Sequence, residues 1–286
     1  MPYIDILFFI AFLGQIFLIS YYFPRKMLSR ERFVIDNYPP SSYPKLYPKP
    51  IEEYEKDLRR TGQLFNFILG IGLLLWVVML RFVPANVWDE CAGFYFILQF
   101  LPMIYLELSA FETYKLMRIK NERSTRSAEL RPRHLFDFVS PILVGAAVFI
   151  YVALMLFILF MSQNELYVGN AANTKMISIT VSNLLLAGII YINIYGKKLN
   201  PHRSNKDRLN QIEIVVKQVV LISIAGTGYI GFDTVVDYLS LSELIPIFQC
   251  LFLQLLAVIS LWGLRSGNIS DIDFDVYKKE ALEVKA

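Results

Sequence analysis

Long apolar segments alternate with polar ones along this chain, and there are seven of the apolar segments. Each is close to the ~20 residues that an α-helix needs to cross the hydrocarbon core of a bilayer. Apolar residues continue around nearly the whole circumference of each expected helix, whereas a helix of a soluble protein keeps one polar face. The predicted spans are Tyr3–Phe23, Gln63–Val83, Cys91–Tyr114, Pro141–Met161, Met176–Tyr195, Ile212–Phe232 and Leu244–Leu264.

In lipid, only helices and closed barrels satisfy their backbone hydrogen bonds, and barrel strands would be short and would alternate apolar with polar residues. We therefore predict an all-α, polytopic integral membrane protein with seven transmembrane helices. The composition agrees with this class, since 55% of the residues are hydrophobic and 19% are charged. The pattern predicts a single membrane domain, residues 1–286, that ends in a tail over residues 265–286.

Positive charges predict the orientation of the spans. Of the 28 Lys and Arg residues, 25 fall in the tail or in the segments after spans one, three and five, and the exceptions are Arg81, Lys175 and Lys217. Because positive loops stay in the cytoplasm, we expect the N-terminus outside and the C-terminus in the cytoplasm. The first span has no basic leader before it, so we expect a retained anchor.

The same basic residues indicate partners. They are topological signals first, so we expect anionic lipid headgroups of the bilayer beside them and no nucleic acid. The short outer loops carry no Asn-x-Ser/Thr sequon, which fits the inner (cytoplasmic) membrane of a bacterium. The proline- and tyrosine-rich stretch 37–50 is either a docking strip for a protein partner or an ordered strap across the helix ends, and the second interpretation is favoured.

Polar side chains inside the spans are the candidates for function. Glu107 is the strongest, because ionisable groups in lipid are costly and mark pathways, and a buried carboxylate suits proton coupling. Amides and a hydroxyl near mid-depth either line a common path or join helices as structural contacts. These mid-depth residues are Gln15, Gln99, Asn183, Thr227 and Gln254. Glu213 and Lys217, four residues apart, are expected to form a structural ion pair.

Small residues and prolines suggest where helices approach each other. Gly62, Asn66 and Gly70 form one stripe, and Ser223, Thr227 and Gly231 form another. Such stripes let backbones pack closely. Pro102 and Pro246 are expected to kink spans three and seven. The sequence therefore predicts a functional core of spans two, three, six and seven.

A weak internal sequence repeat relates the first three spans to the last three. Leu98–Leu101 resembles Leu253–Leu256, and Gly70–Gly72 resembles Gly226–Gly228. Two parallel three-helix units joined by span four would make Gln99 and Gln254 symmetry mates.

Cofactor and catalytic motifs are not evident. No nucleotide-binding loop or metal-ligand spacing is present, so we expect neither a cofactor nor a metal. Cys91 and Cys250 are expected to be two buried thiols rather than a disulfide. His134 and Asp137 are three residues apart and offer an acid–base pair, although an interfacial helix explains them better.

Three functions follow from these patterns. The leading hypothesis is a transporter or channel for a small solute or ion, with Glu107 as the candidate proton carrier. The alternative is a sensor or assembly subunit that docks partners on its basic loops. A lipid-modifying enzyme that uses His134 and Asp137 is the third, and we do not expect the chain to be an enzyme.

Overall fold

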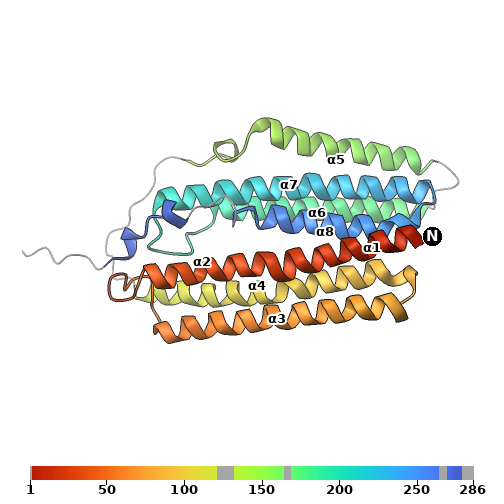
Figure 1. Cartoon of the computed structure of the whole chain (residues 1–286). Helices are drawn as coiled ribbons and strands as arrows, with labels where there is room; N and C mark the ends of the chain where they lie inside the picture. The colour runs from red at the N-terminus through yellow and green to blue at the C-terminus, as the bar shows by residue number, and fades with distance from the viewer. Residues whose placement is uncertain (1, 121–131, 164–168, 264–268, 279–286) are drawn as a thin grey trace, which may run out of the picture.

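The computed structural model describes residues 2–120, 132–163, 169–263 and 269–278 (Figure 1). Most of these residues are helical and none of them lies in a strand, and seven of the helices are long and apolar enough to cross a membrane. The predicted all-α class is therefore confirmed, and so is the expectation of seven helices long and apolar enough to span a membrane. The basic residues Arg123, Arg126, Arg131, Arg265, Lys279 and Lys285 lie outside the described residues.

The first span is one continuous helical segment made of three elements. Its order is α1 (Pro2–Gln15), the π-helix η1 (Ile16–Tyr22) and α2 (Phe23–Asn37). The other long helices are α3 (Ile51–Phe82), α4 (Trp88–Ile119), α5 (Pro141–Met161), α6 (Gly169–Tyr195), α7 (Asn205–Tyr238) and α8 (Ile245–Ser260). Short 3-10 turns are η2 (Ala85–Val87), η3 (Leu135–Asp137), η4 (Ser242–Leu244), η5 (Ile269–Asp271) and η6 (Asp275–Tyr277).

Several helices are much longer than their apolar runs. At about 1.5 Å per residue, the 32 residues of α3 and of α4 measure about 48 Å, whereas the 21 residues of α5 measure about 31 Å. A hydrocarbon core is only about 30 Å thick. Polar extensions therefore continue the apolar helices at one end of the bundle, and the residues before span two form the polar first part of α3.

The two ends of the bundle differ in charge. We call the end that carries the α2–α3 connection, the α6–α7 connection and η6 the basic end, and the end where α1 begins the acidic end (Figure 1). The amino-terminal residues of α1 and the described carboxyl-terminal residues thus lie at opposite ends, as an odd number of spans requires.

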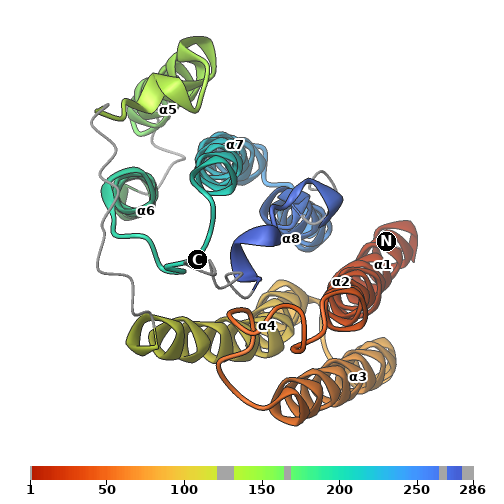
Figure 2. The ribbon, with the colours of Figure 1, turned by 90° about the vertical axis from the view of Figure 1, so that its left-hand side faces the viewer.

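The helices form two groups that meet at α7 and α8. In the end-on view, α1, α2, α3 and α4 lie on one side and α5, α6 and α7 on the other, with α8 between them (Figure 2). α8 packs on α1, α4 and α7, while α5 and α6 both pack mainly on α7. Pro246 lies in the first turn of α8, where its missing N–H leaves no hydrogen bond unmade. The prediction that Pro246 kinks span seven is therefore wrong. Pro102 lies inside α4, which continues past it.

A cap of non-spanning segments covers the basic end. Tyr38 stacks on Phe274 with the ring centroids 3.8 Å apart, and the Lys45 N–H donates to the Tyr277 carbonyl. The Tyr277 hydroxyl accepts a hydrogen bond from Asn200 at 2.8 Å. Burial raises the pKa of Tyr277 to about 12, an effect that Arg203 partly opposes. The tail is therefore docked on the bundle over residues 269–278.

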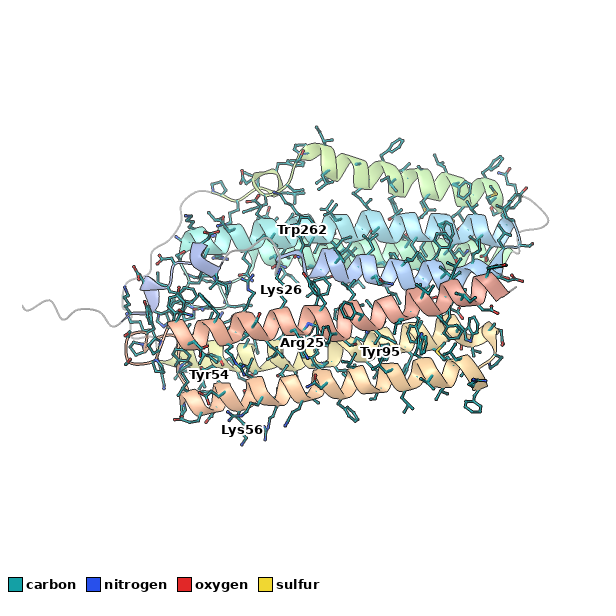
Figure 3. All side chains as sticks on the ribbon, in the orientation of Figure 1. Arg25, Lys26, Tyr54, Lys56, Tyr95 and Trp262 are labelled. Carbon is teal, nitrogen blue, oxygen red and sulfur yellow. The ribbon has the colours of Figure 1, made fainter. Side chains whose placement is uncertain are left out.

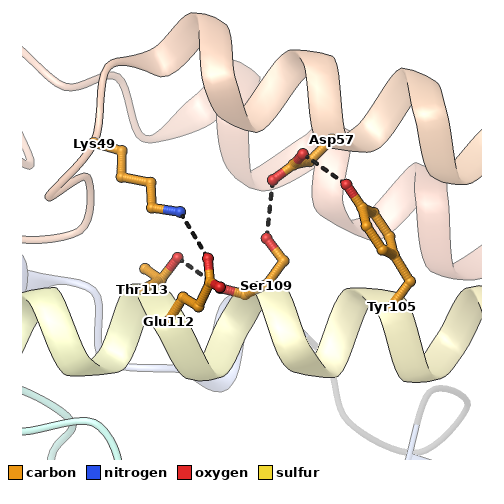
Figure 4. A network of polar contacts seen from close by, with 6 residues as sticks. All are labelled: Lys49, Asp57, Tyr105, Ser109, Glu112 and Thr113. Atoms are coloured by element: carbon orange, nitrogen blue, oxygen red, sulfur yellow. Dashed lines mark hydrogen bonds and ion pairs between the residues drawn. The ribbon is translucent and has the colours of Figure 1, made fainter.

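One ion pair and two hydrogen bonds join the strap and the polar part of α3 to α4 (Figure 4). Lys49 pairs with Glu112 at 3.5 Å, and Asp57 accepts hydrogen bonds from Tyr105 at 3.0 Å and from Ser109 at 2.9 Å. The strap thus has its own partners within the chain, as the favoured interpretation requires.

Gly72 is the one glycine of α3 whose missing side chain the packing requires. A Cβ at Gly72 would lie 2.0 Å from the Tyr95 hydroxyl oxygen, whereas a Cβ at Gly70 would meet nothing within 4 Å. Gly70, which belongs to the stripe expected to pack closely, therefore faces open space, and the close approach occurs two residues later.

We predict that Gly72→Ala destabilises the protein by about 1–3 kcal/mol, because the new methyl group must push Tyr95 out of a packed core. Gly70→Ala is the matched control in the same helix and is expected to be neutral or stabilising, since alanine favours helix by up to ~1 kcal/mol over glycine. Unfolding in detergent measures both. Equal stabilities for the two variants would contradict this account of Tyr95.

Candidate functional site

A chain of hydrogen bonds crosses the interior of the first helix group. The Gln15 Nε2 donates to Gln99 Oε1 at 3.2 Å, and the Gln99 Nε2 donates to the Ser20 Oγ at 2.8 Å. Ser20 and Tyr95 hydroxyls are 2.9 Å apart, and the Tyr95 hydroxyl donates to the Ile68 carbonyl at 3.0 Å. Since Tyr95 uses its proton on Ile68, Ser20 must donate to Tyr95, and every bond then runs in one direction.

The π-helix η1 positions the groups of the first span that take part in this hydrogen-bonded chain. Within it, the Phe23 N–H bonds the Leu18 carbonyl five residues back, which widens the turn relative to an α-helix. The Gln15 carbonyl at its start accepts a further bond from Gln99 Nε2 at 3.4 Å. The π-turn therefore brings both the Ser20 hydroxyl and a backbone carbonyl within reach of Gln99.

Glycines admit two further glutamines to the same interface. Gln254 of α8 donates to the Ala11 carbonyl at 3.0 Å, and its Oε1 lies 3.3 Å from the Cβ position of Gly14. Gln249 donates to the Asp89 carbonyl at 3.0 Å, and its Nε2 lies 2.9 Å from the Cβ position of Gly93. Amide side chains thus join α1, α4 and α8 along their length.

A pocket opens at the acidic end of this interface. It has a volume of about 550 Å³, and three carboxylates line it, Asp5 of α1, Asp89 of α4 and Glu243 of η4. Phe8 also lines it. We call it the acidic pocket.

A second opening lies toward the basic end, between α2 and α3. Its volume is about 710 Å³, and Arg25, Arg32 and Arg59 line it. Ser20, a member of the hydrogen-bonded chain, is also among its lining residues. We call it the arginine groove.

Aromatic rings separate the two openings. Phe8 stacks on Trp88 with centroids 4.7 Å apart and on Phe12 at 5.9 Å, and Phe12 meets Tyr95 edge-on at 5.8 Å. Phe8 and Phe12 are fully buried. A row of side chains therefore leads from the acidic pocket to the arginine groove, and each contacts the next. Their order is Phe8, Phe12, Tyr95 and Ser20.

The predicted polar residues fall into separate sets. Gln15 and Gln99 bond each other, and both are fully buried. Asn183 of α6 accepts from Ser223 of α7 at 2.6 Å, and the Thr227 hydroxyl donates to the Ser223 carbonyl, on the far side of α8 from the first set. The predicted mid-depth residues therefore do not converge on one place.

Glu107 joins neither set. It is exposed, and no hydrogen bond or ion pair connects it to the residues that the structure describes. It lies eight residues, about 12 Å, beyond Gln99 toward the basic end. Gln254 bonds α1 rather than α6, so its environment is not the one that symmetry with Gln99 predicts.

The remaining candidates have local partners. Glu213 and Lys217 form an exposed ion pair at 2.6 Å. The Asp137 carboxylate accepts from the His134 N–H at 2.8 Å, so it caps its own turn. Cys91 and Cys250 are free. No three His, Cys, Asp or Glu side chains in the described ranges lie close enough to hold a metal ion.

An ion cluster at the acidic end was missed by the sequence reasoning. Lys175 of α6 lies 2.7 Å from Asp233 and 2.5 Å from Asp237, both of α7, and its side chain is only 13% exposed. Two aspartates four residues apart repel each other on a helix surface. Two aspartates at this spacing, together with a lone lysine expected near the same end of the bundle, could have indicated the ion cluster from the sequence.

Comparisons of the chain with protein-family models, curated proteins and solved structures find no match. No relative therefore bears on its function.

We predict that Lys175→Ala destabilises the protein by roughly 1–3 kcal/mol, less than for a fully buried pair, because two carboxylates lose their cation. Adding Asp233→Asn and Asp237→Asn is expected to restore part of the loss. Lys217→Ala is the control and should cost only about 0.3–0.5 kcal/mol, as exposed helix pairs do. Thermal unfolding in detergent measures the series, and equal effects of the two lysine variants would contradict the prediction.

Proposed function

We propose that this chain is a membrane transporter or channel for a small solute or ion, with its path between α1, α3, α4 and α8. The observation that carries the proposal is that two openings, one toward each end of the bundle, approach the same helix. The acidic pocket reaches Phe8, and the arginine groove reaches Ser20. Only the contacts of Phe12 and Tyr95 lie between them.

The intervening contacts are suited to a gate. Aromatic rings exclude water where they pack, and a π-turn is an irregular element of the kind found at functional sites. Gln15 Oε1 is buried and has no hydrogen-bond donor among the described residues. A buried amide oxygen of this kind offers a place for a polar solute or a water once the rings separate.

The acidic pocket favours positive or neutral polar solutes, because three carboxylates line it. Glu107 stays the candidate for proton coupling only as an ionisable group within an apolar span, since it is exposed rather than buried and lies about 12 Å from Gln99 toward the basic end. The distribution of lysine and arginine supports an outer N-terminus and a cytoplasmic C-terminus. The absence of an Asn-x-Ser/Thr sequon from the short outer loops fits the inner membrane of a bacterium.

The alternative, a sensor or scaffold that docks partners on its basic loops, has less support. Tyr38 stacks on Phe274, and Tyr47 meets Tyr54 edge-on. The strap that would offer these rings to a partner therefore uses them within the chain.

We predict that purified protein in liposomes carries small cations or small neutral solutes faster than empty liposomes do, and that Phe12→Ala increases the flux several-fold by removing the buried ring between the two openings. Stopped-flow light scattering with potassium salts and small polyols measures both. Phe94→Ala is the control, because this α4 ring is 64% exposed and lies away from the core.

Absence of flux in both the wild type and Phe12→Ala, with both proteins folded and inserted, would refute the proposed path. An equal increase in Phe94→Ala would show that leakiness follows from general loosening of the bundle.

A further inference from the structure

The arginine groove has a chemistry that the proposed path does not explain. Three guanidinium groups, those of Arg25, Arg32 and Arg59, line it, and Asp36 is the one carboxylate among its lining residues. All three arginines are exposed. The groove is therefore a concentration of positive charge on the surface between α2 and α3.

The arginines are only lightly engaged by the chain itself. Arg25 lies over the Tyr21 ring at 4.3 Å, and Arg59 pairs with Glu55 at 3.3 Å across one helical turn. Arg32 has no hydrogen bond or ion pair with the residues that the structure describes. Their donors are thus largely available to an anion.

The wall of the groove is apolar as well as basic. Leu28 and Phe33 of α2 and Leu58 and Phe65 of α3 line it beside the arginines. The Cβ position of Gly62 has only Leu28 within 4 Å, at 3.6 Å, so the missing side chain leaves space in the wall. A ligand that fits has a negative head and an apolar body.

The groove also lies where a lipid headgroup would be. Arg25 and Lys26 follow the first apolar run directly, and they lie at about the same level along the bundle as Trp262, just past the end of α8 (Figure 3). Tryptophan, arginine and lysine side chains are enriched at the level of the lipid headgroups. The acyl chains lie deeper, in the hydrocarbon core of the bilayer.

We propose that the arginine groove binds one anionic phospholipid of the cytoplasmic leaflet. The phosphate lies among Arg25, Arg32 and Arg59, because guanidinium groups donate paired hydrogen bonds to phosphate oxygens. An acyl chain lies on the apolar wall beside Phe65. Basic pockets between membrane helices recognise anionic headgroups by this chemistry.

This inference rests on membrane placement and not on transport. Because Ser20 lines the groove, a bound lipid would cover the basic-end opening of the proposed path, which would make lipid occupancy a regulator of that path.

Native mass spectrometry of the detergent-solubilised full chain tests the site, with phosphatidylglycerol and phosphatidylcholine of the same acyl chains as probes. We expect phosphatidylglycerol to bind about tenfold tighter, since each basic residue contributes to attraction of anionic lipid. In Arg25→Gln/Arg32→Gln/Arg59→Gln the preference is expected to vanish. Arg32→Gln alone should lose most of the preference for phosphatidylglycerol. Because Arg32 has no hydrogen bond or ion pair with the described residues, this variant cannot disturb folding by removing one.

Lys26→Gln/Lys56→Gln/Arg60→Gln is the matched control. It removes the same charge from the same two helices at residues that do not line the groove, so the preference should remain. Loss of the preference in the control would show general attraction to a basic surface, and its retention in the groove variant would place the lipid elsewhere. Inorganic phosphate that displaces phosphatidylglycerol at equal concentration would show a free-phosphate site. Each of these results overturns the proposal.

Discussion

The hydrogen-bonded chain from Gln15 to the Ile68 carbonyl is the interaction on which the arrangement of α1, α3 and α4 depends. Apolar surfaces give little preference for one helix over lipid in a membrane, so close packing and interhelical hydrogen bonds decide which helices meet. Each such bond contributes only ~0.6 kcal/mol on average. Four side chains that bond in series nevertheless fix rotation and depth, since no member can turn without leaving another unsatisfied.

The same chain explains the irregularities around it. Ser20 reaches Gln99 because η1 is a π-helix, and Tyr95 reaches Ile68 because position 72 is a glycine. The aromatic rings of Phe8 and Phe12 then close over the chain toward the acidic end. One interaction therefore accounts for a widened turn, an obligatory glycine and the separation of the two openings.

The sequence predicted the helices well and the site only in part. Apolar length identifies a span whatever its neighbours are, so the seven apolar helices could be recognised, although the polar extensions of α4 and α7 lay outside the predicted spans. Gln15 and Gln99 were recognisable from their depth. Their pairing was not, because it depends on how each helix is rotated.

Gly72 and Ser20 carry no signal of their own, since their importance comes from the reach of Tyr95 and from the register of a π-turn. Lys175 was visible as an exception to the charge pattern, but its two aspartates were overlooked.

In the proposed path, the acidic pocket and the arginine groove open to opposite sides of the membrane. Single cysteines test it, Glu243→Cys for the pocket and Ser29→Cys for the groove, each introduced after Cys91→Ala and Cys250→Ala remove the native thiols. A membrane-impermeant maleimide applied to intact cells and to inverted vesicles labels each side separately. We expect Glu243→Cys to react only from outside and Ser29→Cys to react only from the cytoplasmic side. Labelling of both positions from the same side would contradict it.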